Sequence, residues 1–338
     1  MYGTKAKSCS MWVGVLAAWI ALAPAGARGA GMHAGTAVSF DTLAADCGAC
    51  HQEKYQQWRY GAGADLDSAG NGSYHAMSST ENMFTTMLAK MQPDMQAYCK
   101  GCHEAGNAWA VQDKVNDIPQ PRTTNVEEGV HCVTCHFDGR KIVSKAAVQD
   151  PLFCATCHNE NTGLVEIYNE WFADYGGGKT CQQCHMADGN HAAPGFHSPS
   201  FIGKALTVAP PVISDTITAG VPFAFRFSVT NSGTGHSVPE DLFRVLTVRA
   251  SIVDGANAEL YECVNTYYKR NALFGENPAD TVVIKSGATA TLDCPGAVVG
   301  SPGVYTVRIE VSQDSNRVDP TLNHNAFMTS AFTTFVAR

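Results

Sequence analysis

The chain has 338 residues, of which 45% are hydrophobic and 16% charged, and its formal net charge is −8. This length suggests two domains, since domains usually contain roughly 100–200 residues. The excess of 31 Asp and Glu over 23 Lys and Arg argues against nucleic-acid binding. A mean hydropathy of −0.11, without an apolar run near the ~18 residues that cross a bilayer, argues against both an integral membrane protein and a disordered chain.

The first 30 residues have the pattern of an export signal. Lys5 and Lys7 form a short positive segment, Met11–Ala23 is apolar, and Pro24–Ala30 offers small residues at which the leader can be cleaved. We therefore expect a signal peptide at residues 1–30 and an exported, periplasmic or extracellular mature chain without a membrane span; an uncleaved anchoring helix is the alternative. Cleavage removes three basic residues and no acidic one, so the formal charge becomes −11.

Ten of the 13 cysteines occur in five copies of the pattern Cys-x-x-Cys-His, which is typical of c-type haem attachment. The copies are Cys47, Cys50 and His51; Cys99, Cys102 and His103; Cys132, Cys135 and His136; Cys154, Cys157 and His158; and Cys181, Cys184 and His185. Two thiols bond the two vinyl groups of one porphyrin, so they must lie about one helical turn apart, and the next histidine binds the iron as proximal ligand. The sequence predicts five covalent haem c groups.

A single Cys-x-x-Cys pattern also occurs in zinc sites and in redox dithiols. Zinc sites combine such pairs in even numbers and do not need a histidine after each pair. A disulfide framework fails similarly, because ten cysteines at this spacing would close strained loops and leave the histidines without a role. Five copies in an exported chain therefore favour haem over zinc and over disulfides.

Residues 31–203 contain all five motifs, which leaves roughly 35 residues per haem. So little protein cannot build an ordinary apolar core around each porphyrin, and we expect the haems to form much of the core and to lie nearly in contact. Helices are predicted at Asp46–Arg59, Ser79–Gln92 and Leu164–Tyr175, with loops elsewhere. The first domain is thus predicted to be a pentahaem cytochrome domain of few helices and mostly loops.

From residue 204 the sequence changes to short alternating runs separated by turn residues. The predicted strands are Ala205–Val208, Pro222–Val229, Leu242–Val253, Leu260–Tyr267, Thr281–Ile284, Ala288–Leu292, Val304–Val311 and Ala331–Val336. Seven or eight short strands over residues 204–338 predict an all-β, immunoglobulin-like sandwich. Cys263 and Cys294 each lie in or beside a strand, and in an exported protein we expect a disulfide between them, with unpaired buried thiols as the alternative.

A low-spin electron-transfer haem needs a second strong axial ligand, whereas an open position suits substrate binding. Seven histidines outside the five motifs could serve as that ligand: His33, His75, His131, His191, His197, His236 and His324. We expect the distal ligands among His75, His131, His191, His197 and His236. His33, in the N-terminal tail, and His324, in a C-terminal loop, are not expected to bind iron.

Two of these candidates have unusual positions. His131 directly precedes Cys132, so it cannot easily bind the haem of its own motif but can face a stacked one. His236 lies in the predicted β region, in a loop between Gly233 and Pro239 from which a side chain can reach across a domain interface. The alternative is a loop histidine for His236, and a surface or capping histidine for His75.

The motifs resemble those of multihaem c-type cytochromes, of the tetrahaem electron carrier and octahaem reductase kind. The resemblance is carried by Cys47-x-x-Cys50-His51 with Tyr55-x-x-Trp58 and Tyr74-His75-Ala76; by Glu128-Gly129-Val130-x-Cys132-x-x-Cys135-His136; by Cys184-His185-Met186 with His191 and Gly195-x-His197; and by Asn231-Ser-Gly-Thr-Gly-His236-Ser-Val-Pro239. It implies that His75 and either His191 or His197 are distal ligands, and that His236 is another. Reductases of this kind use a lysine-ligated or open catalytic haem, whereas all five motifs here end in histidine, which argues against catalysis.

These features predict an electron carrier, not an enzyme, with a row of low-potential bis-histidine haems that serves periplasmic or extracellular respiration. Its partners would be redox proteins or an extracellular acceptor, and ten propionates on an acidic chain favour a basic or metal-bridged partner. A discrete shuttle and a homopolymeric, filament-forming cytochrome both fit. The alternative is a reductase of a small nitrogen or sulfur oxyanion at one five-coordinate haem; a haem-bearing adhesion module is a third hypothesis.

Overall fold

The computed structural model describes residues 37–61, 73–76, 88–89, 91–159, 166–176, 178–195, 198–214, 216–314, 317 and 325–338. Val38–Arg338 forms one compact unit. The predicted signal peptide and most of the predicted helix at residues 79–92 lie outside the described residues. Within the described ranges, no helix combines the length and the apolar character that crossing a membrane requires.

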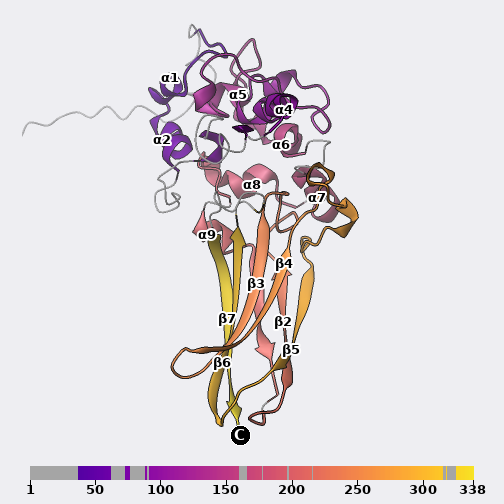
Figure 1. The fold of residues 1–338 in the computed structure, drawn as a ribbon. Helices are drawn as coiled ribbons and strands as arrows, with labels where there is room; N and C mark the ends of the chain where they lie inside the picture. The colour runs from indigo at the N-terminus through magenta and orange to yellow at the C-terminus, as the bar shows by residue number, and fades with distance from the viewer. Residues whose placement is uncertain are drawn as a thin grey trace, which may run out of the picture. The chain divides into compact units, whose positions relative to one another are not determined.

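Short helices make up the first part of this unit (Figure 1). The α-helices are α1 (Ala44–Gly48), α2 (Gln52–Tyr60), α4 (Pro93–His103), α5 (Cys132–His136), α6 (Pro151–His158), α7 (Ile167–Asp174), α8 (Cys181–His185) and α9 (Pro199–Ile202). Short 3₁₀ turns lie at η2 (Tyr74–Ala76), η3 (Ala108–Ala110), η4 (Val126–Glu128), η5 (Lys145–Gln149) and η6 (Ala187–Gly189).

The helix predictions are confirmed only in part. The structure divides the predicted helix Asp46–Arg59 into α1 and α2, and the prediction at Leu164–Tyr175 corresponds to the shorter α7. Loops were expected elsewhere, and this expectation is wrong at α4, α5, α6 and α8, which are helical. Each of these four helices contains an attachment motif, so the spacing of the thiols itself requires a helical turn there.

Local sequence fixes where two motif-bearing helices begin. The Asp150 carboxylate accepts the Leu152 N–H at 3.0 Å, and Pro151 occupies the first position of α6, where a missing N–H costs nothing. Before α8, the Thr180 hydroxyl accepts the Gln183 N–H at 3.3 Å and the Gln183 side chain accepts the Thr180 N–H at 2.8 Å. This reciprocal capping box satisfies two of the amide groups that a helix start leaves without partners.

The helical part has a small hydrophobic core of its own. Among its described residues, Ala44, Trp58 and Ala76 form a buried cluster, against which Tyr55 and Cys132 pack. Such a cluster contributes only a few kcal/mol of apolar burial, since one large side chain contributes about 1.5–3 kcal/mol. We therefore expect this part of the chain to depend on its bound groups for stability.

The second part is a sandwich of two antiparallel sheets, as the sequence predicted in outline (Figure 1). Its strands are β1 (Leu206–Val212), β2 (Phe223–Asn231), β3 (Val245–Val253), β4 (Glu259–Tyr267), β5 (Thr289–Ala297), β6 (Gly303–Asp314) and β7 (Asn325–Ala337). One sheet has the order β1-β2-β5 and the other β4-β3-β6-β7. The boundary predicted between residues 203 and 204 falls between α9 and β1.

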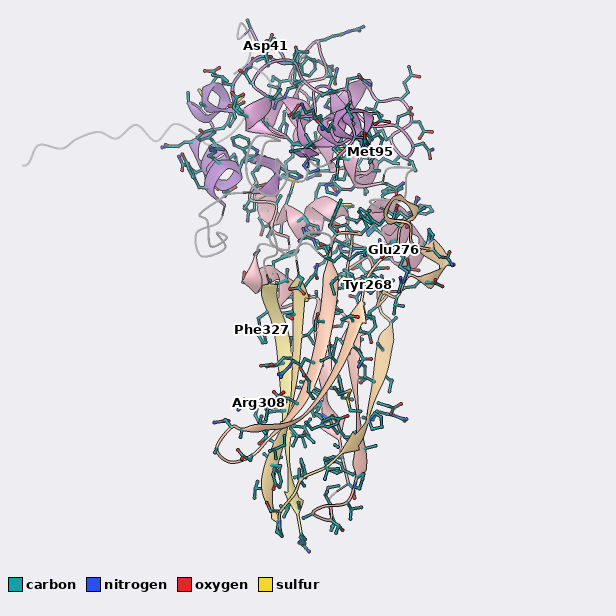
Figure 2. The ribbon with its side chains drawn as sticks, in the orientation of Figure 1. Asp41, Met95, Tyr268, Glu276, Arg308 and Phe327 are labelled. Carbon is teal, nitrogen blue, oxygen red and sulfur yellow. A yellow bond between two sulfur atoms is a disulfide. The ribbon has the colours of Figure 1, made fainter. Side chains whose placement is uncertain are left out.

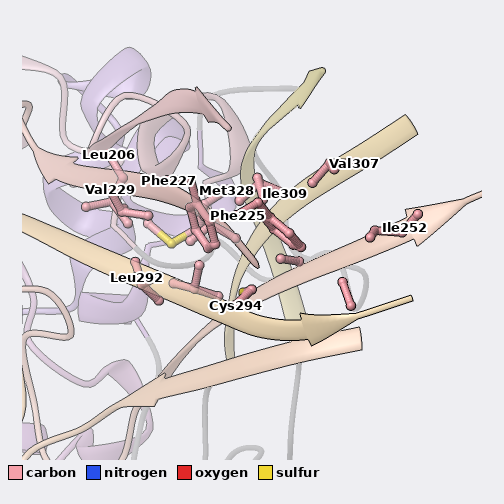
Figure 3. Close-up of a cluster of buried hydrophobic side chains, with 14 of the residues drawn as sticks. Leu206, Phe225, Phe227, Val229, Ile252, Leu292, Cys294, Val307, Ile309 and Met328 are labelled. Carbon is pink, nitrogen blue, oxygen red and sulfur yellow. The ribbon is translucent and has the colours of Figure 1, made fainter. Parts of the chain in front are cut away.

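Alternate residues of the strands point into the space between the two sheets (Figure 3). On β2 these are Phe225, Phe227 and Val229, and on β6 they include Val307 and Ile309. The period of two follows from the pleat, which sends successive side chains to opposite faces of a sheet. The sandwich thus has a continuous apolar core, unlike the helical part.

One strand prediction is wrong. The segment Thr281–Ile284 forms no strand: Val282 makes an isolated bridge with Tyr268, and Ile284 makes another with Val238. Because the two bridges go to different segments of the chain, they cannot form a ladder. The other seven predicted strands correspond to β1–β7 with changed bounds.

The predicted disulfide between Cys263 and Cys294 is confirmed. Cys263 lies on β4 and Cys294 on β5, which are edge strands of different sheets. The bond therefore joins the two layers of the sandwich at one side.

Replacing both Cys263 and Cys294 by serine should lower the free energy of unfolding of the sandwich by about 3–4 kcal/mol, because the unfolded chain loses a constraint on a loop of about 30 residues. Urea unfolding of the holoprotein, followed by circular dichroism, measures the difference. Wild-type protein treated with a reductant is the control and should match the variant. Equal urea midpoints for the oxidised wild type and the variant would contradict a stabilising role.

Arg317 lies at the centre of a second stabilising cluster. Its guanidinium donates to both oxygens of the Glu276 carboxylate, at 2.8 and 2.7 Å, and to the carbonyls of Leu242 and Lys269. It also lies 4.9 Å from the centre of the Tyr268 ring; Figure 2 labels Tyr268 and Glu276. The hydrogen bonds from Arg317 lower the pKa of Glu276 to about 2.

The stability contributed by Glu276 should depend on pH. Its pKa is lower in the folded protein than the ordinary 4.5, so the stabilisation is complete above about pH 4.5 and is lost as the pH falls toward 2. Glu276→Gln should therefore cost about 2 kcal/mol near pH 6 and little near pH 2. Urea titrations of both proteins at several pH values check this, and a pH-independent difference would contradict it.

Candidate functional site

Each Cys-x-x-Cys-His motif lies on a turn of helix. Motifs two to five occupy the last turn of α4, all of α5, the last turn of α6 and all of α8. In the first motif, the His51 N–H donates to the Cys47 carbonyl at 2.9 Å and so continues the turn beyond α1. The two sulfur atoms of a motif therefore lie on one side of the backbone, as attachment to a single porphyrin requires.

Sulfur atoms of different motifs form hydrogen bonds with one another. The pairs are Cys47 with Cys132, Cys102 with Cys157, and Cys154 with Cys181. Cys135 interacts electrostatically with both Cys154 and Cys157. The motifs are thus adjacent in the order first, third, fourth and fifth, and the second motif lies beside the fourth.

The thiols of the central motifs are held in their neutral form. Burial raises the pKa of Cys135 to about 12. The hydrogen bond to Cys181, with burial, raises the pKa of Cys154, and the hydrogen bond to Cys102, with burial, raises that of Cys157. Burial thus contributes to the raised pKa of all three thiols.

In the part of the chain that the structure describes, His136, His158 and His185 each face a second imidazole. The ring centres are 6.2 Å apart for His158 and His75, 6.1 Å for His136 and His191, and 6.4 Å for His185 and His236. Two metal–imidazole bonds of about 2 Å, together with about 1 Å from each bonded nitrogen to its ring centre, place the centres about 6 Å apart. The spacing therefore fits two axial ligands of one iron.

The hydrogen bonds of these rings select the tautomer that can bind a metal. Nδ1 of His185 donates to the Pro194 carbonyl at 2.7 Å, and Nδ1 of His191 donates to the Gly189 carbonyl at 2.8 Å. A carbonyl only accepts, so the proton lies on Nδ1 and the lone pair of Nε2 remains available. Nδ1 of His236 donates in the same way to the Ser237 carbonyl, at 2.9 Å.

Burial also favours the neutral imidazole at the third motif. It lowers the pKa of the half-buried His136 to about 4, with smaller contributions from His191 and His51. A metal ligand must be the neutral imidazole, and this side chain is neutral near pH 7. The residues present therefore fit haem with histidine ligation.

His131 has a different environment. Its side chain is fully buried, and its Nδ1 accepts the Val133 N–H at 3.4 Å, which places the proton on Nε2. Its Nε2 lies 3.7 Å from the Glu128 carboxylate. Binding of iron through Nε2 would need the opposite tautomer, so the axial role of His131 remains a prediction that this geometry does not favour.

Of the remaining predicted ligands, some lie within the described residues and others outside them. His51 and His103 lie at the ends of their motifs, and both side chains are exposed. His197, predicted as a possible distal ligand, lies outside the described residues, as do His33 and His324.

His236 comes from the sandwich and faces the fifth motif. It lies in the loop after β2, where Asn231 Nδ2 and the Thr234 hydroxyl both donate to the His236 carbonyl, at 2.8 and 2.5 Å. At Gly235 a Cβ atom would lie 2.9 Å from Tyr175, so only glycine permits this close approach of the loop to the end of α7.

Sequence reasoning missed the groups that orient these ligands. Gly189, Pro194 and Ser237 act through backbone carbonyls, which no side-chain pattern reveals. It also missed Glu170, which lies on α7 and accepts the Ser237 N–H at 3.1 Å. The only signal in the sequence was the Gly- and Pro-rich loop around His236.

The chain is similar to known proteins in sequence and in structure. The family model "Cytochrome c554 and c-prime" matches residues 46–137. A penta-heme cytochrome c552 from Thermochromatium tepidum is similar in structure, with a TM-score of 0.61 and 16% identity over 88% of this chain and 99% of that one. A CARDB domain from Pyrococcus furiosus gives a TM-score of 0.25 and 14% identity over 39% of this chain and 87% of that one, too weak to carry an argument. Comparison with curated proteins gives no match.

The matches agree with a multihaem c-type cytochrome fold. The family model covers the first three attachment motifs, and the structural similarity extends over both the helical part and the sandwich. At 16% identity this similarity shows the fold alone.

Substitution of a distal histidine should open one iron. In His75→Ala, His191→Ala or His236→Ala, about one fifth of the haem should change from low spin to high spin, because one of five irons loses a strong axial ligand. Electron paramagnetic resonance of the oxidised holoprotein measures the fraction. Thr334→Ala, on the exposed face of β7, is the control and should give the wild-type spectrum. An unchanged spectrum would remove that histidine from the set of ligands.

Proposed function

We propose that the protein transfers electrons through five covalently bound haem c groups and does not turn over a substrate. The observation that carries this proposal is the contiguity of the five attachment motifs, whose cysteines interact through hydrogen bonds or electrostatically from the first motif to the fifth. Haem supplies one-electron chemistry, and the protein supplies attachment, axial ligands and spacing.

The adjacency of the motifs defines a path. Electrons that enter at the first motif would pass the third and fourth before the fifth, and the second motif would form a branch at the fourth. Histidine on both sides of the iron favours low potentials, since methionine ligation raises them. The three imidazole pairs support this ligation for the third, fourth and fifth sites.

We also propose that the sandwich is related to the immunoglobulin fold. An immunoglobulin constant domain places its first, second, fifth and fourth strands in one sheet and the others in the second. Here β1, β2 and β5 keep that order, while β4 pairs with β3 in the other sheet. The sandwich would serve the haem chain by supplying His236 to the fifth iron.

We further propose that residues 1–30 are a signal peptide and that the mature protein works in the periplasm or outside the cell. Its partners would be redox proteins or an extracellular acceptor. Haems near both ends of the path would allow the protein to act as a soluble shuttle, or as a subunit of a filament in which haems of successive chains meet.

The cofactor content tests the proposal directly. Mature protein from a host that attaches c-type haem should contain five haems per chain, and alkylation after denaturation should leave all ten motif cysteines unmodified, because thioether bonds survive denaturation. Haem absorbance after alkaline pyridine treatment and the mass of the alkylated chain measure the two numbers. Fewer than five haems would contradict the count, and a resting high-spin haem in the wild type would favour the reductase.

Electron cryomicroscopy at low and high concentration separates the two carrier forms. Ordered filaments with a continuous row of haems would establish the polymer, and discrete particles at every concentration would establish the shuttle.

A further inference from the structure

The imidazole of His236 is oriented by its neighbour in the chain. Nδ1 of His236 donates to the Ser237 carbonyl at 2.9 Å, so the position of Ser237 determines where the opposite nitrogen of the ring points. Ser237 is 1% exposed, and its own N–H must find an acceptor inside the protein.

That acceptor is Glu170, on α7 of the helical part. Glu170 Oε2 accepts the Ser237 N–H at 3.1 Å, while Oε1 lies 2.5 Å from the Lys269 ammonium. Lys269, next to β4, also donates to the Glu240 carbonyl at 2.9 Å. One carboxylate therefore joins α7 to two separate segments of the sandwich.

The contact is largely shielded from water. The side chain of Lys269 is 6% exposed and that of Glu170 is 17% exposed. Removing one partner of a buried ion pair leaves an uncompensated charge and is costly, so the three groups should hold one arrangement. A continuous chain of contacts thus runs from Lys269 through Glu170 and Ser237 to His236.

We propose that Glu170 is a positioning residue for the fifth haem site: its carboxylate anchors Ser237 and thereby presents His236 to the iron held by His185. This inference rests on the proposed axial role of His236. It assigns the α7–sandwich contact a role in ligation in addition to its role in packing.

The two functions of the carboxylate can be separated by substitution. Glu170→Ala removes the acceptor and should increase the high-spin fraction by up to one fifth of the haem, with matching carbon monoxide binding by the reduced protein. Glu170→Gln keeps an oxygen acceptor for Ser237 and should stay low spin. It leaves the Lys269 charge unpaired, however, which should raise the potential of one haem because positive charge favours the reduced state. Lys269→Met leaves the Glu170 charge unpaired and should lower that potential.

Paramagnetic resonance, carbon monoxide titration and a spectroelectrochemical titration of the holoproteins measure these effects. Glu166→Ala is the matched control, since Glu166 directly precedes α7 and is exposed, and it should behave as wild type. If Glu170→Ala does not assemble five haems, Glu170→Met decides the question, because it nearly keeps the side-chain volume but cannot accept the Ser237 N–H. A fully low-spin Glu170→Met protein that does not bind carbon monoxide overturns the proposal.

His236→Ala distinguishes the possible failures. If His236→Ala opens one iron but Glu170→Ala leaves spin state and carbon monoxide binding unchanged, Glu170 is not a positioning residue and the proposed ligation stands. If neither variant changes the spectrum, His236 is not an axial ligand, and both this inference and the proposed ligation of the fifth site fail.

Discussion

In the proposed holoprotein, the structure of the helical part would depend on the attachment of porphyrins at five helical turns. Each turn places two sulfur atoms and one histidine, and cysteines of different motifs interact with one another. Backbone ordering costs about 1–2 kcal/mol per residue, which the small cluster around Trp58 cannot offset. The proposed haems would therefore take the place of a side-chain core, and the same close spacing that stabilises the fold would allow electrons to pass between them.

Ligand orientation depends on the backbone more than on side chains. The Nδ1 atoms of His185, His191 and His236 all donate to main-chain carbonyls, so each ring keeps its tautomer as long as the local loop keeps its shape. A carbonyl carries no net charge and does not titrate, so this selection does not change with pH. His131 shows the opposite case, because a backbone N–H beside Nδ1 selects the other tautomer.

The features that could be predicted from the sequence depend on local spacing. The attachment motifs, the class of the β-region and the Cys263–Cys294 disulfide all follow from patterns within short segments or from the small number of cysteines left over. The pairing of His75 with His158 could not be predicted, because it depends on how distant turns pack around groups that the sequence only implies. The prediction of a strand at Thr281–Ile284 was wrong for a related reason, because alternating hydrophobicity predicts an extended segment but not its partner strand.

The contrast between the two parts gives the fifth site a particular physical character. The sandwich has its own apolar core and a disulfide. The loop that carries His236 is held by hydrogen bonds from Asn231 and Thr234, which do not require a porphyrin. His185, by comparison, lies on a five-residue helix whose order depends on the attached group. If both histidines bind the fifth iron as proposed, one axial ligand is preorganised and the other is not. The hydrogen bond between Glu170 and Ser237 would then be where the rigid sandwich restrains the helical part. In this proposal, ligation of the fifth iron would couple the packing of the two parts to the end of the electron path.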